Sequence, residues 1–506
     1  MKAGCGRTAR PVWAADEGQR SGSRAFSDPT AAATPRRAER WTSGTNMGHG
    51  RAMRQKSEQL ELALDSRGET PRSQYSGEAR KTSRGDERSG GDHRLMEQVV
   101  GRVNALAALK RVKQNQGSPG VDGMTVDDLS PYLTAHWERI REQLLTGRYQ
   151  PQPVKRSEIP KPGGGTRQLG IPTVLDRFIQ QCLLQVLQPQ FDPTFSEHSY
   201  GFRPGRSAHH AVRAAQRYIQ SGRRWVADVD LAKFFDRVNH DVLMERLSRR
   251  IADGRVLRLI RRYLVAGIMA DGVVVERHEG TPQGGPLSPL LANVLLDEVD
   301  QALEKRGLVF ARYADDLNVY TGSQRAADDA MATLKRLFAR LRLQVNDAKS
   351  TVARAWERKF LGYSFWVAVG RVIRVRVAPA ALAEMKVRVR AITSRTGGRS
   401  LTTIAAELRS YLTGWKLYFQ LAETPRVFRD LDEWIRRRTR AVQLKQWKQG
   451  PTVYRELRAR GVPDRVTRAA AAHASRWWAM AAHGALQTAL PTSYFDRLGV
   501  PRLAGR

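Results

Sequence analysis

Two adjacent carboxylates, Asp315 and Asp316, lie in residues 308–320, a segment otherwise rich in apolar and aromatic residues. Such residues favour strands, so the pattern predicts a strand–turn–strand hairpin with both acids at its tip. Neighbouring carboxylates repel each other unless a cation neutralises them. Mg²⁺ binds carboxylate oxygens together with substrate phosphates, and two such ions can hold an in-line phosphoryl transfer. Taken alone, however, an Asp-Asp pair is most often an ordinary polar turn.

A second acidic strand is predicted at residues 224–230, where Asp228 and Asp230 are two positions apart. Side chains at this spacing lie on one face of a strand. The strand leads into a helix predicted from residue 240, so its end could bring a third metal ligand to the hairpin. Spacing alone does not choose between Asp228 and Asp230.

The elements around these acids follow from the hydrophobic pattern of the chain. Strands and helices alternate over residues 93–375, which predicts an α+β region, and the chain from residue 376 onward reads as helical. Residues 1–92 contain few large apolar side chains and are predicted to be a disordered tail. Individual helices are predicted at 96–112, 133–145, 177–187 and 290–296, and a strand–glycine hairpin–strand at 159–167.

Charge and cysteine content restrict the class of protein further. The 506 residues include 85 Lys and Arg against 50 Asp and Glu, a net charge of +35 that favours a polyanionic partner. Composition alone does not separate a nucleic-acid enzyme from an RNA-binding structural protein. The two cysteines, Cys5 and Cys182, cannot build a disulfide framework or a cysteine-based zinc module. We expect a cytoplasmic protein, because no apolar run is long enough for a membrane helix and no secretory signal is apparent.

Several short motifs then carry a family resemblance. Tyr-Ala-Asp-Asp at 313–316 and Asp-Leu-Ala-Lys-Phe-Phe-Asp at 230–236 resemble the acidic motifs of group II intron-encoded reverse transcriptases, also called maturases. The resemblance implies a right-hand polymerase with fingers and palm at 93–375. It selects Asp230 over Asp228 and implies Asp230, Asp315 and Asp316 as catalytic ligands of two Mg²⁺ ions. The backbone carbonyl of Leu231 is implied as a further metal contact.

The resemblance also implies residues that bind the incoming nucleotide. Lys161 and Arg167 flank the glycine hairpin of the fingers and are expected to grip the triphosphate, for which Arg offers bidentate contacts and Lys a point charge. Gln283, in the Gly/Pro-rich segment 280–289, is expected beside the nascent base pair. Phe235 is expected to exclude a ribose 2′-OH and so to favour deoxynucleotides, with a core phenylalanine as the alternative. Lys349 is implied as the proton donor to pyrophosphate, with a solvated lysine as the alternative.

Basic residues at two places are expected to contact RNA. The segment 199–207 matches a family hallmark, so Arg203 and Arg206 are candidates for template binding, with a plain structural loop as the alternative. Residues 376–450 resemble the helical thumb or maturase domain, in which Trp and Arg interleave, whereas Trp415 and Tyr418 are expected in the core. The candidate RNA-binding residues of this domain are Arg436, Arg437, Arg438, Arg440 and Lys445.

The final segment, 451–506, is expected to bind nucleic acid and is similar to the class C branch, which lacks the His-Asn-His endonuclease domain. Taken together, the resemblance implies an RNA-directed DNA polymerase that assists splicing of its own intron and supports intron mobility. Its expected partners are intron RNA, a primed RNA template, a DNA target and dNTPs, in the nucleoid region of a bacterial cytoplasm.

Three alternative functions remain in view. A bacterial reverse transcriptase of defence or diversity generation would usually lack the maturase-like residues 411–448. An RNA-binding splicing factor without polymerase activity would not need Asp230, Asp315 and Asp316 intact. An RNA-dependent RNA polymerase shares the palm, but Phe235 and the Tyr-Ala-Asp-Asp sequence favour DNA synthesis.

Overall fold

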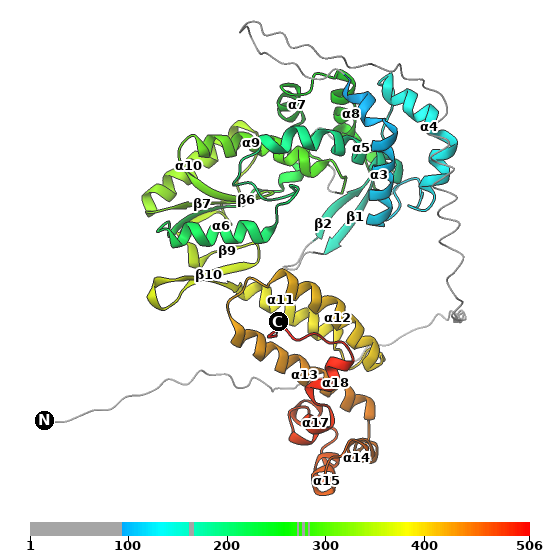
Figure 1. The fold of residues 1–506 in the computed structure, drawn as a ribbon, viewed down its shortest axis with the longest axis vertical. Helices are drawn as coiled ribbons and strands as arrows, with labels where there is room; N and C mark the ends of the chain where they lie inside the picture. The colour runs from blue at the N-terminus through cyan, green and yellow to red at the C-terminus, as the bar shows by residue number, and fades with distance from the viewer. Residues whose placement is uncertain (1–93, 161–165, 271–272, 276–278, 282–283, 506) are drawn as a thin grey trace, which may run out of the picture. The chain divides into compact units, whose positions relative to one another are not determined.

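The structure, a computed structural model, describes residues 94–160, 166–270, 273–275, 279–281 and 284–505 (Figure 1). The tail predicted at 1–92 and the candidate residues Lys161 and Gln283 lie outside the described residues. Arg167 belongs to a described strand, but its side chain is not among those described.

The first part of the fold is a set of helices beside a small sheet. One helix was predicted at 96–112, but the structure has two, because Gly101 adopts an extended backbone conformation (φ −61°, ψ 141°) and interrupts the helical path. The sheet has strand order β2-β1-β4-β5, and Ile159 pairs with Arg167 across the predicted hairpin. These elements are α2 (Leu95–Val99), α3 (Arg102–Asn115), α4 (Leu129–Leu145), β1 (Val154–Pro160), β2 (Thr166–Ile171), α5 (Val174–Phe191), β4 (Ile268–Ala270) and β5 (Val273–Val275).

A second, antiparallel sheet holds the acidic segments, with strand order β6-β7-β3-β8. Its strands are β3 (Trp225–Val229), β6 (Val309–Tyr313), β7 (Asp316–Thr321) and β8 (Thr351–Arg354), and the helices packed against it are α6 (Ala208–Gln220), α9 (Ser288–Glu304) and α10 (Gln324–Arg340). Two further helices, α7 (His240–Ser248) and α8 (Gly254–Val265), pack against each other, and α7 also packs against α9. Short 3₁₀ turns lie at Asp192–Thr194, Phe234–Asp236, Ala355–Glu357 and Val369–Arg371.

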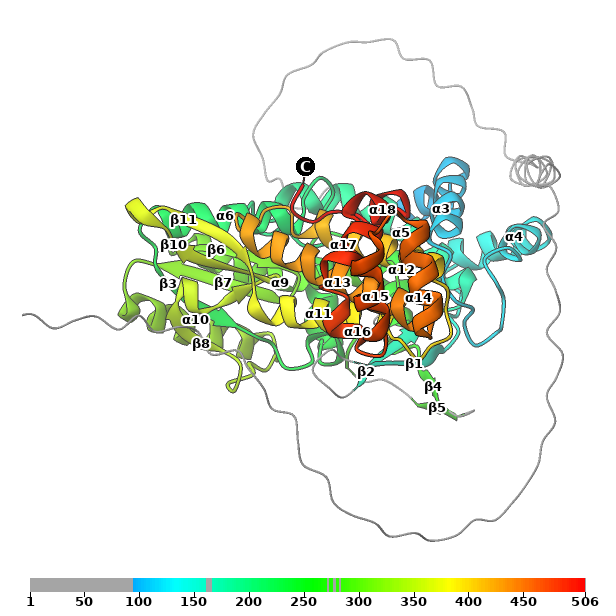
Figure 2. The same cartoon turned by 90° about the horizontal axis from the view of Figure 1, so that it is seen from below.

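Alternate residues of this sheet enter different cores. Ala227 and Val319 belong to the core that contains residues of α9 and α10, whereas Val226 and Tyr320 belong to the core that contains residues of α6. Figure 2 shows α6 and α10 on opposite sides of the sheet. The period of two along each strand produces this division.

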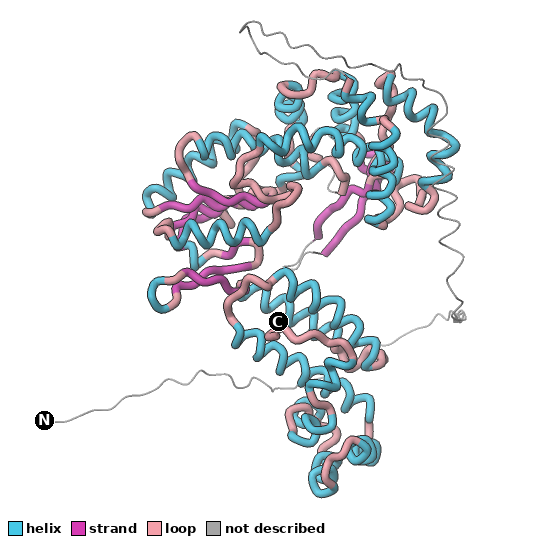
Figure 3. The backbone as a smooth tube through the Cα atoms, viewed as in Figure 1, coloured by secondary structure: helices cyan, strands magenta, loops and turns pink. Residues whose placement is uncertain are grey.

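The chain then forms a three-stranded sheet of order β11-β10-β9 and continues as helices, as predicted (Figure 3). One hydrophobic cluster runs from the strands through the helices to Leu503, so the predicted boundary at 450/451 does not separate two cores. Among the described helices, none combines the length and the apolar character needed to cross a bilayer. The elements are β9 (Lys359–Phe360), β10 (Tyr363–Val367), β11 (Ile373–Val377), α11 (Pro379–Ile392), α12 (Leu401–Tyr418), α13 (Pro425–Trp447), α14 (Gly450–Ala459), α15 (Asp464–Ala472), α16 (Trp477–Met480), α17 (Gly484–Ala489) and α18 (Thr492–Arg497).

Candidate active site

The predicted acidic hairpin is formed by β6 and β7. Tyr313 pairs with Asp316, which leaves a two-residue turn of Ala314 and Asp315. Ala314 has φ +58°, a left-handed conformation that residues other than glycine seldom adopt. Such a conformation costs on the order of 1–3 kcal/mol and persists only where the surrounding structure enforces it.

A buried polar network beneath the turn provides that support. Arg312 is 1% exposed and its Nε donates to Asp300 Oδ1 at 2.8 Å. Its Nη1 donates to the Ala314 carbonyl at 3.0 Å and to Asn293 Oδ1 at 2.9 Å, and its Nη2 donates to Ser199 Oγ at 2.8 Å. Burial raises the pKa of the Asp300 carboxyl, and the charge of Arg312 opposes that rise. The network therefore fixes the carbonyl that immediately precedes Asp315.

The loop before α6 lies directly against the same turn. The Tyr200 N–H donates to the Arg312 carbonyl at 2.8 Å, and Asn293 Nδ2 donates to the Gly201 carbonyl at 2.9 Å. A Cβ atom on Gly201 would lie 2.3 Å from the backbone nitrogen of Ala314. Only glycine allows the two backbones to approach this closely.

The acids of both segments line one cavity of about 820 Å³. Burial and then repulsion from Asp228, Asp315 and Asp230 raise the pKa of Asp316 to about 7, and Lys359 opposes this rise. The cavity lining also includes Leu231. The structure therefore brings together all four residues that the family resemblance implied as metal ligands.

The surroundings of Asp228 and Asp230 differ, which spacing could not reveal. Arg358 Nε donates to Asp228 Oδ2 at 2.7 Å, and Asn318, with its amide nitrogen turned toward the carboxylate, donates to Asp228 Oδ1 at 3.0 Å. The carboxylate of Asp230 makes no hydrogen bond or ion pair with a described residue. Its backbone is held instead, because its N–H donates to Ser350 Oγ at 3.0 Å. Asp230 is thus the carboxylate available to a cation.

The donor chemistry of the cavity fits a hard divalent cation. Its acids offer carboxylate oxygens, the ligands that Mg²⁺ prefers, and their mutual repulsion is what an added positive charge relieves. Within the described ranges, no three acidic, histidine or cysteine side chains already converge as a ready-made metal site. To bind an ion, the side chains of these acids would therefore have to change conformation.

Three basic residues reach the cavity, one of them predicted. Lys349 is exposed and lines it, and its role as proton donor stays a prediction. Arg358 and Lys359 also line it and were missed by sequence reasoning. The sequence clue that could have identified them is their position just before Leu361 and Gly362. These two residues form a tight turn, and their φ values of +51° and +77° suit a two-residue hairpin.

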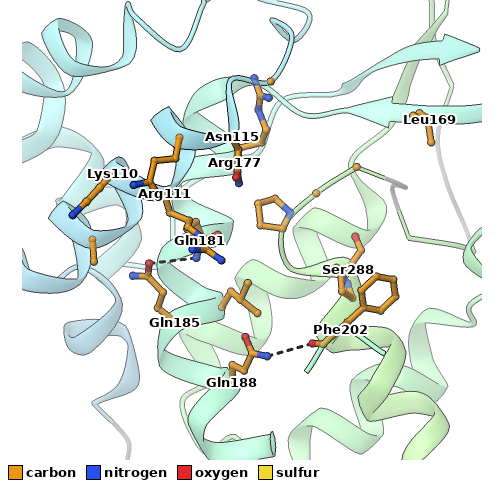
Figure 4. A pocket seen from close by; sticks show the side chains of 18 of the residues that line it. Lys110, Arg111, Asn115, Leu169, Arg177, Gln181, Gln185, Gln188, Phe202 and Ser288 are labelled. Carbon is orange, nitrogen blue, oxygen red and sulfur yellow. Dashed lines mark hydrogen bonds between the residues drawn. The ribbon is translucent and has the colours of Figure 1, made fainter. Parts of the chain in front are cut away.

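Phe235 lines a separate cavity of about 1090 Å³. Figure 4 shows this cavity from close by. Lys110 and Arg111 of α3, Arg177 of α5 and Phe202 also line it. Phe234 is 3% exposed and packs edge-on against the Phe235 ring, with centroids 5.1 Å apart. Phe234 is therefore a core residue, whereas Phe235 is half-buried, packs against the same core and lines the cavity.

Two known protein families match this chain, one over the region that contains the acidic cavity and one over the helices that follow it. Residues 159–365 match the family described as "Reverse transcriptase (RNA-dependent DNA polymerase)", and residues 382–461 match "Group II intron, maturase-specific domain". These two matches are to a reverse transcriptase domain and to the maturase domain of group II introns, in that order along the chain. The fold of the chain is accordingly that of a right-hand polymerase followed by a helical maturase domain. The reverse transcriptase domain family uses divalent metal ions.

Individual relatives cover only parts of the chain. It is 42% identical over 195 residues to Protein YkfC of Escherichia coli, covering 38% of this chain and 51% of YkfC. It is 32% identical over 253 residues to the group II intron-encoded protein LtrA of Lactococcus lactis, covering 50% of this chain and 41% of LtrA. The chain thus spans about half the length, or less, of these curated relatives. A solved structure, a partial Cas6-RT-Cas1–Cas2 complex, covers 48% of this chain and 42% of its own at 25% identity and a TM-score of 0.33.

Within the reverse transcriptase domain, the prediction that Arg203 contacts template is corrected. Arg203 is 8% exposed, and its Nε donates to Asp192 Oδ1 at 2.8 Å. Its Nη1 donates to the Ser196 and Ser199 carbonyls at 2.6 and 3.0 Å. Every nitrogen of this guanidinium binds the protein itself, so Arg203 holds the loop together. Arg206 is half-buried and keeps part of its guanidinium accessible.

Within the maturase domain, Arg440 is a second correction. It is 8% exposed, and its Nε donates to the Leu490 carbonyl at 3.0 Å. Tyr418 was expected in the core, but it is 39% exposed and donates to the Leu361 carbonyl at 3.0 Å. Trp415, at 8% exposure, is buried as predicted.

The remaining basic candidates of this domain are half-exposed, and Arg437, Arg438 and Lys445 lie beside tryptophan rings. Arg437 lies 4.1 Å from the centroid of the Trp478 ring, and Lys445 lies 3.9 Å from that of Trp477. Arg438 lies 5.5 Å from the Trp434 ring, and Arg436 is half-exposed. These contacts hold the cations beside flat apolar surfaces.

Proposed function

We propose that this chain is an RNA-directed DNA polymerase encoded by a group II intron, and that it also assists splicing of the intron RNA. The observation that carries the proposal is the single cavity shared by Asp230, Asp315 and Asp316, in a domain followed by a maturase domain. Because the chain spans about half the length of its relatives, activity and substrates are proposed here from its own residues.

In the proposed reaction the protein orients the reactants and the acids hold two Mg²⁺ ions. When bound, these ions would stabilise the attacking and leaving oxygens of phosphoryl transfer. Asp230, Asp315 and Asp316 would hold them, with the Leu231 carbonyl as a further contact. Lys349 would donate a proton toward the leaving pyrophosphate. Lys359 would balance negative charge beside Asp316, as it already does in the structure.

The substrates proposed are dNTPs and a primed RNA template, which would be the intron RNA after its insertion into a DNA target. Phe235 lines the cavity of about 1090 Å³ and would exclude a ribose 2′-OH. Lys161, Arg167 and Gln283 remain predictions from sequence as contacts to the triphosphate and nascent pair. A protein that acts on chromosomal DNA and intron RNA would be located at the bacterial nucleoid.

Splicing assistance is proposed as a binding function of the maturase domain. Binding the folded intron better than misfolded RNA shifts the RNA population toward the active fold. The half-exposed cation–tryptophan pairs, such as Arg437 with Trp478, suit phosphate contact together with stacking on bases. This function needs no metal-bound carboxylate, so it is separable from DNA synthesis.

Primer extension tests the proposal. The purified protein, Mg²⁺ and a primed RNA template are supplied with either dNTPs or rNTPs, and Asp315→Ala serves as the inactive comparison. The proposal expects extension with dNTPs that disappears in Asp315→Ala, while splicing of the host intron at low Mg²⁺ is still accelerated by this variant. No extension with either nucleotide set would favour a splicing factor without polymerase activity, and extension with rNTPs alone would favour an RNA polymerase.

A further inference from the structure

A third cavity, of about 610 Å³, lies along α6 and the loop before it. Its lining shares no residue with the carboxylate cavity or with the cavity beside Phe235. Three arginines, two histidines and two tyrosines contribute, and the acidic residue among the lining is Glu197. The residues that matter most are Arg206, His210, Arg213, Arg217 and Tyr200. We call this group the α6 cavity.

The two arginines that α6 contributes to the cavity have no partner among the described residues. Arg213 and Arg217 are exposed and make no hydrogen bond or ion pair with any described residue. They are four positions apart on one helix, where like charges repel and lower helix stability by a few tenths of a kcal/mol. His210 lies on the same helical face. Packing and helix stability therefore give no reason for this row of cations, whereas an anionic ligand would.

The arginine nearest the loop is held in place before any ligand arrives. Arg206 Nη1 donates to the Glu197 carbonyl at 2.5 Å, and its guanidinium lies 5.7 Å from the centre of the Tyr200 ring. On the other wall, His198 Nδ1 and the Tyr218 hydroxyl are 2.8 Å apart. The buried guanidinium of Arg203 fixes the loop between them. Arg206 would therefore bind an anion with little loss of side-chain freedom, which lowers the entropic cost of that contact.

We propose that the α6 cavity binds backbone phosphates of a nucleic-acid strand that runs outside the two active-site cavities. Guanidinium groups make bidentate contacts with phosphate, and their spacing along a helix suits a chain of phosphates better than a single anion. Four residues of helix separate Arg213 from Arg217 by roughly 6 Å along the axis. RNA and DNA supply the same phosphate chemistry, so the experiment must distinguish them.

The test is binding of end-labelled single-stranded RNA and DNA, followed by fluorescence anisotropy over a range of salt concentrations. The variant is the full chain with both Arg213→Ala and Arg217→Ala. The matched control carries Arg325→Ala and Arg336→Ala, which removes the same charge from exposed positions of α10, on the opposite side of the sheet. Thermal unfolding of all three proteins verifies that they are folded.

The α6 variant is expected to bind at least one of the two strands about tenfold more weakly near 0.15 M salt. Its slope of log K against log salt should fall in magnitude by about 1.4, because two phosphate contacts are lost. Loss on RNA alone identifies an RNA strand, and loss on DNA alone a DNA strand. Unchanged affinity and slope for both strands overturn the proposal, as does an equal loss in the α10 control. The readout is binding, so it stands even if the chain extends no primer.

Discussion

The carboxylate cavity of the palm gathers negative charge, whereas the basic helices of the maturase domain gather positive charge. In the palm, Asp228 is paired with Arg358, whereas the Asp230 carboxylate has no such partner among the described residues. In the maturase domain, Arg440 is buried and donates to the Leu490 carbonyl, whereas Arg437 donates to the Trp478 carbonyl but stays half-exposed over the Trp478 ring. Neighbouring charges of one motif thus differ in both regions: Asp228 but not Asp230 is paired with Arg358, and Arg440 but not Arg437 is buried.

The largest effect should separate the two acids of β3. Asp230→Asn should lower the rate of dNTP incorporation by roughly a thousandfold or more, because a lost metal ligand removes several kcal/mol of charge stabilisation. Asp228→Asn keeps most of its size and should cost far less, since its charge is already opposed by Arg358. Single-turnover primer extension measures both. Equal losses in the two variants would break the distinction between paired and available carboxylates.

The next effect concerns how the palm holds its turn. Gly201→Ala should reduce the incorporation rate by about a hundredfold, because the new Cβ must push the Ala314 backbone away and small displacements of reacting groups are costly. Gly322→Ala is the matched control, since its Cβ would meet open space near the end of β7. Nucleotide KM should change less than kcat. A Gly201→Ala protein as active as Gly322→Ala would show that the close approach does not position the acids.

In the maturase domain, the exposed pairs should affect RNA and not chemistry. Trp478→Ala should weaken intron RNA binding by about 1–3 kcal/mol, the value for a lost stacking contact with a base. Its incorporation rate at saturating primed template should stay close to that of the unaltered chain. Filter binding and primer extension on the same preparation provide the comparison. Weakened extension with unaltered RNA affinity would contradict the assignment.

The smallest effect on activity is expected from Arg203. Arg203→Ala should lower the free energy of unfolding by about 1–3 kcal/mol, because buried carbonyl acceptors lose their donor. The salt dependence of template binding by the folded fraction should not change. Denaturant unfolding measures the free energy of unfolding, and the salt dependence of template binding gives the number of phosphate contacts. A salt slope reduced by about one would restore Arg203 as a phosphate contact.

Sequence predicted the order of elements and the acids, because strand alternation and adjacent carboxylates are local signals. It did not separate Asp228 from Asp230, since a period of two puts both on one face and only Arg358, far along the chain, distinguishes them. It also misassigned Arg203 and Arg440. A basic run shows that charge is present but does not say which side chains turn inward. The break at Gly101 was hidden because apolar spacing continues on both sides of it.

Direct observation of a bound divalent ion tests the central claim most sharply. Mn²⁺ can stand in for Mg²⁺ and be followed by electron paramagnetic resonance in the presence of dNTP and primed template. The account predicts that Asp230→Asn and Asp315→Asn lose the protein-bound Mn²⁺ signal, and that Asp228→Asn retains it. Retention of the signal by all three variants would contradict the assignment of Asp230 and Asp315 as the residues that hold the metal.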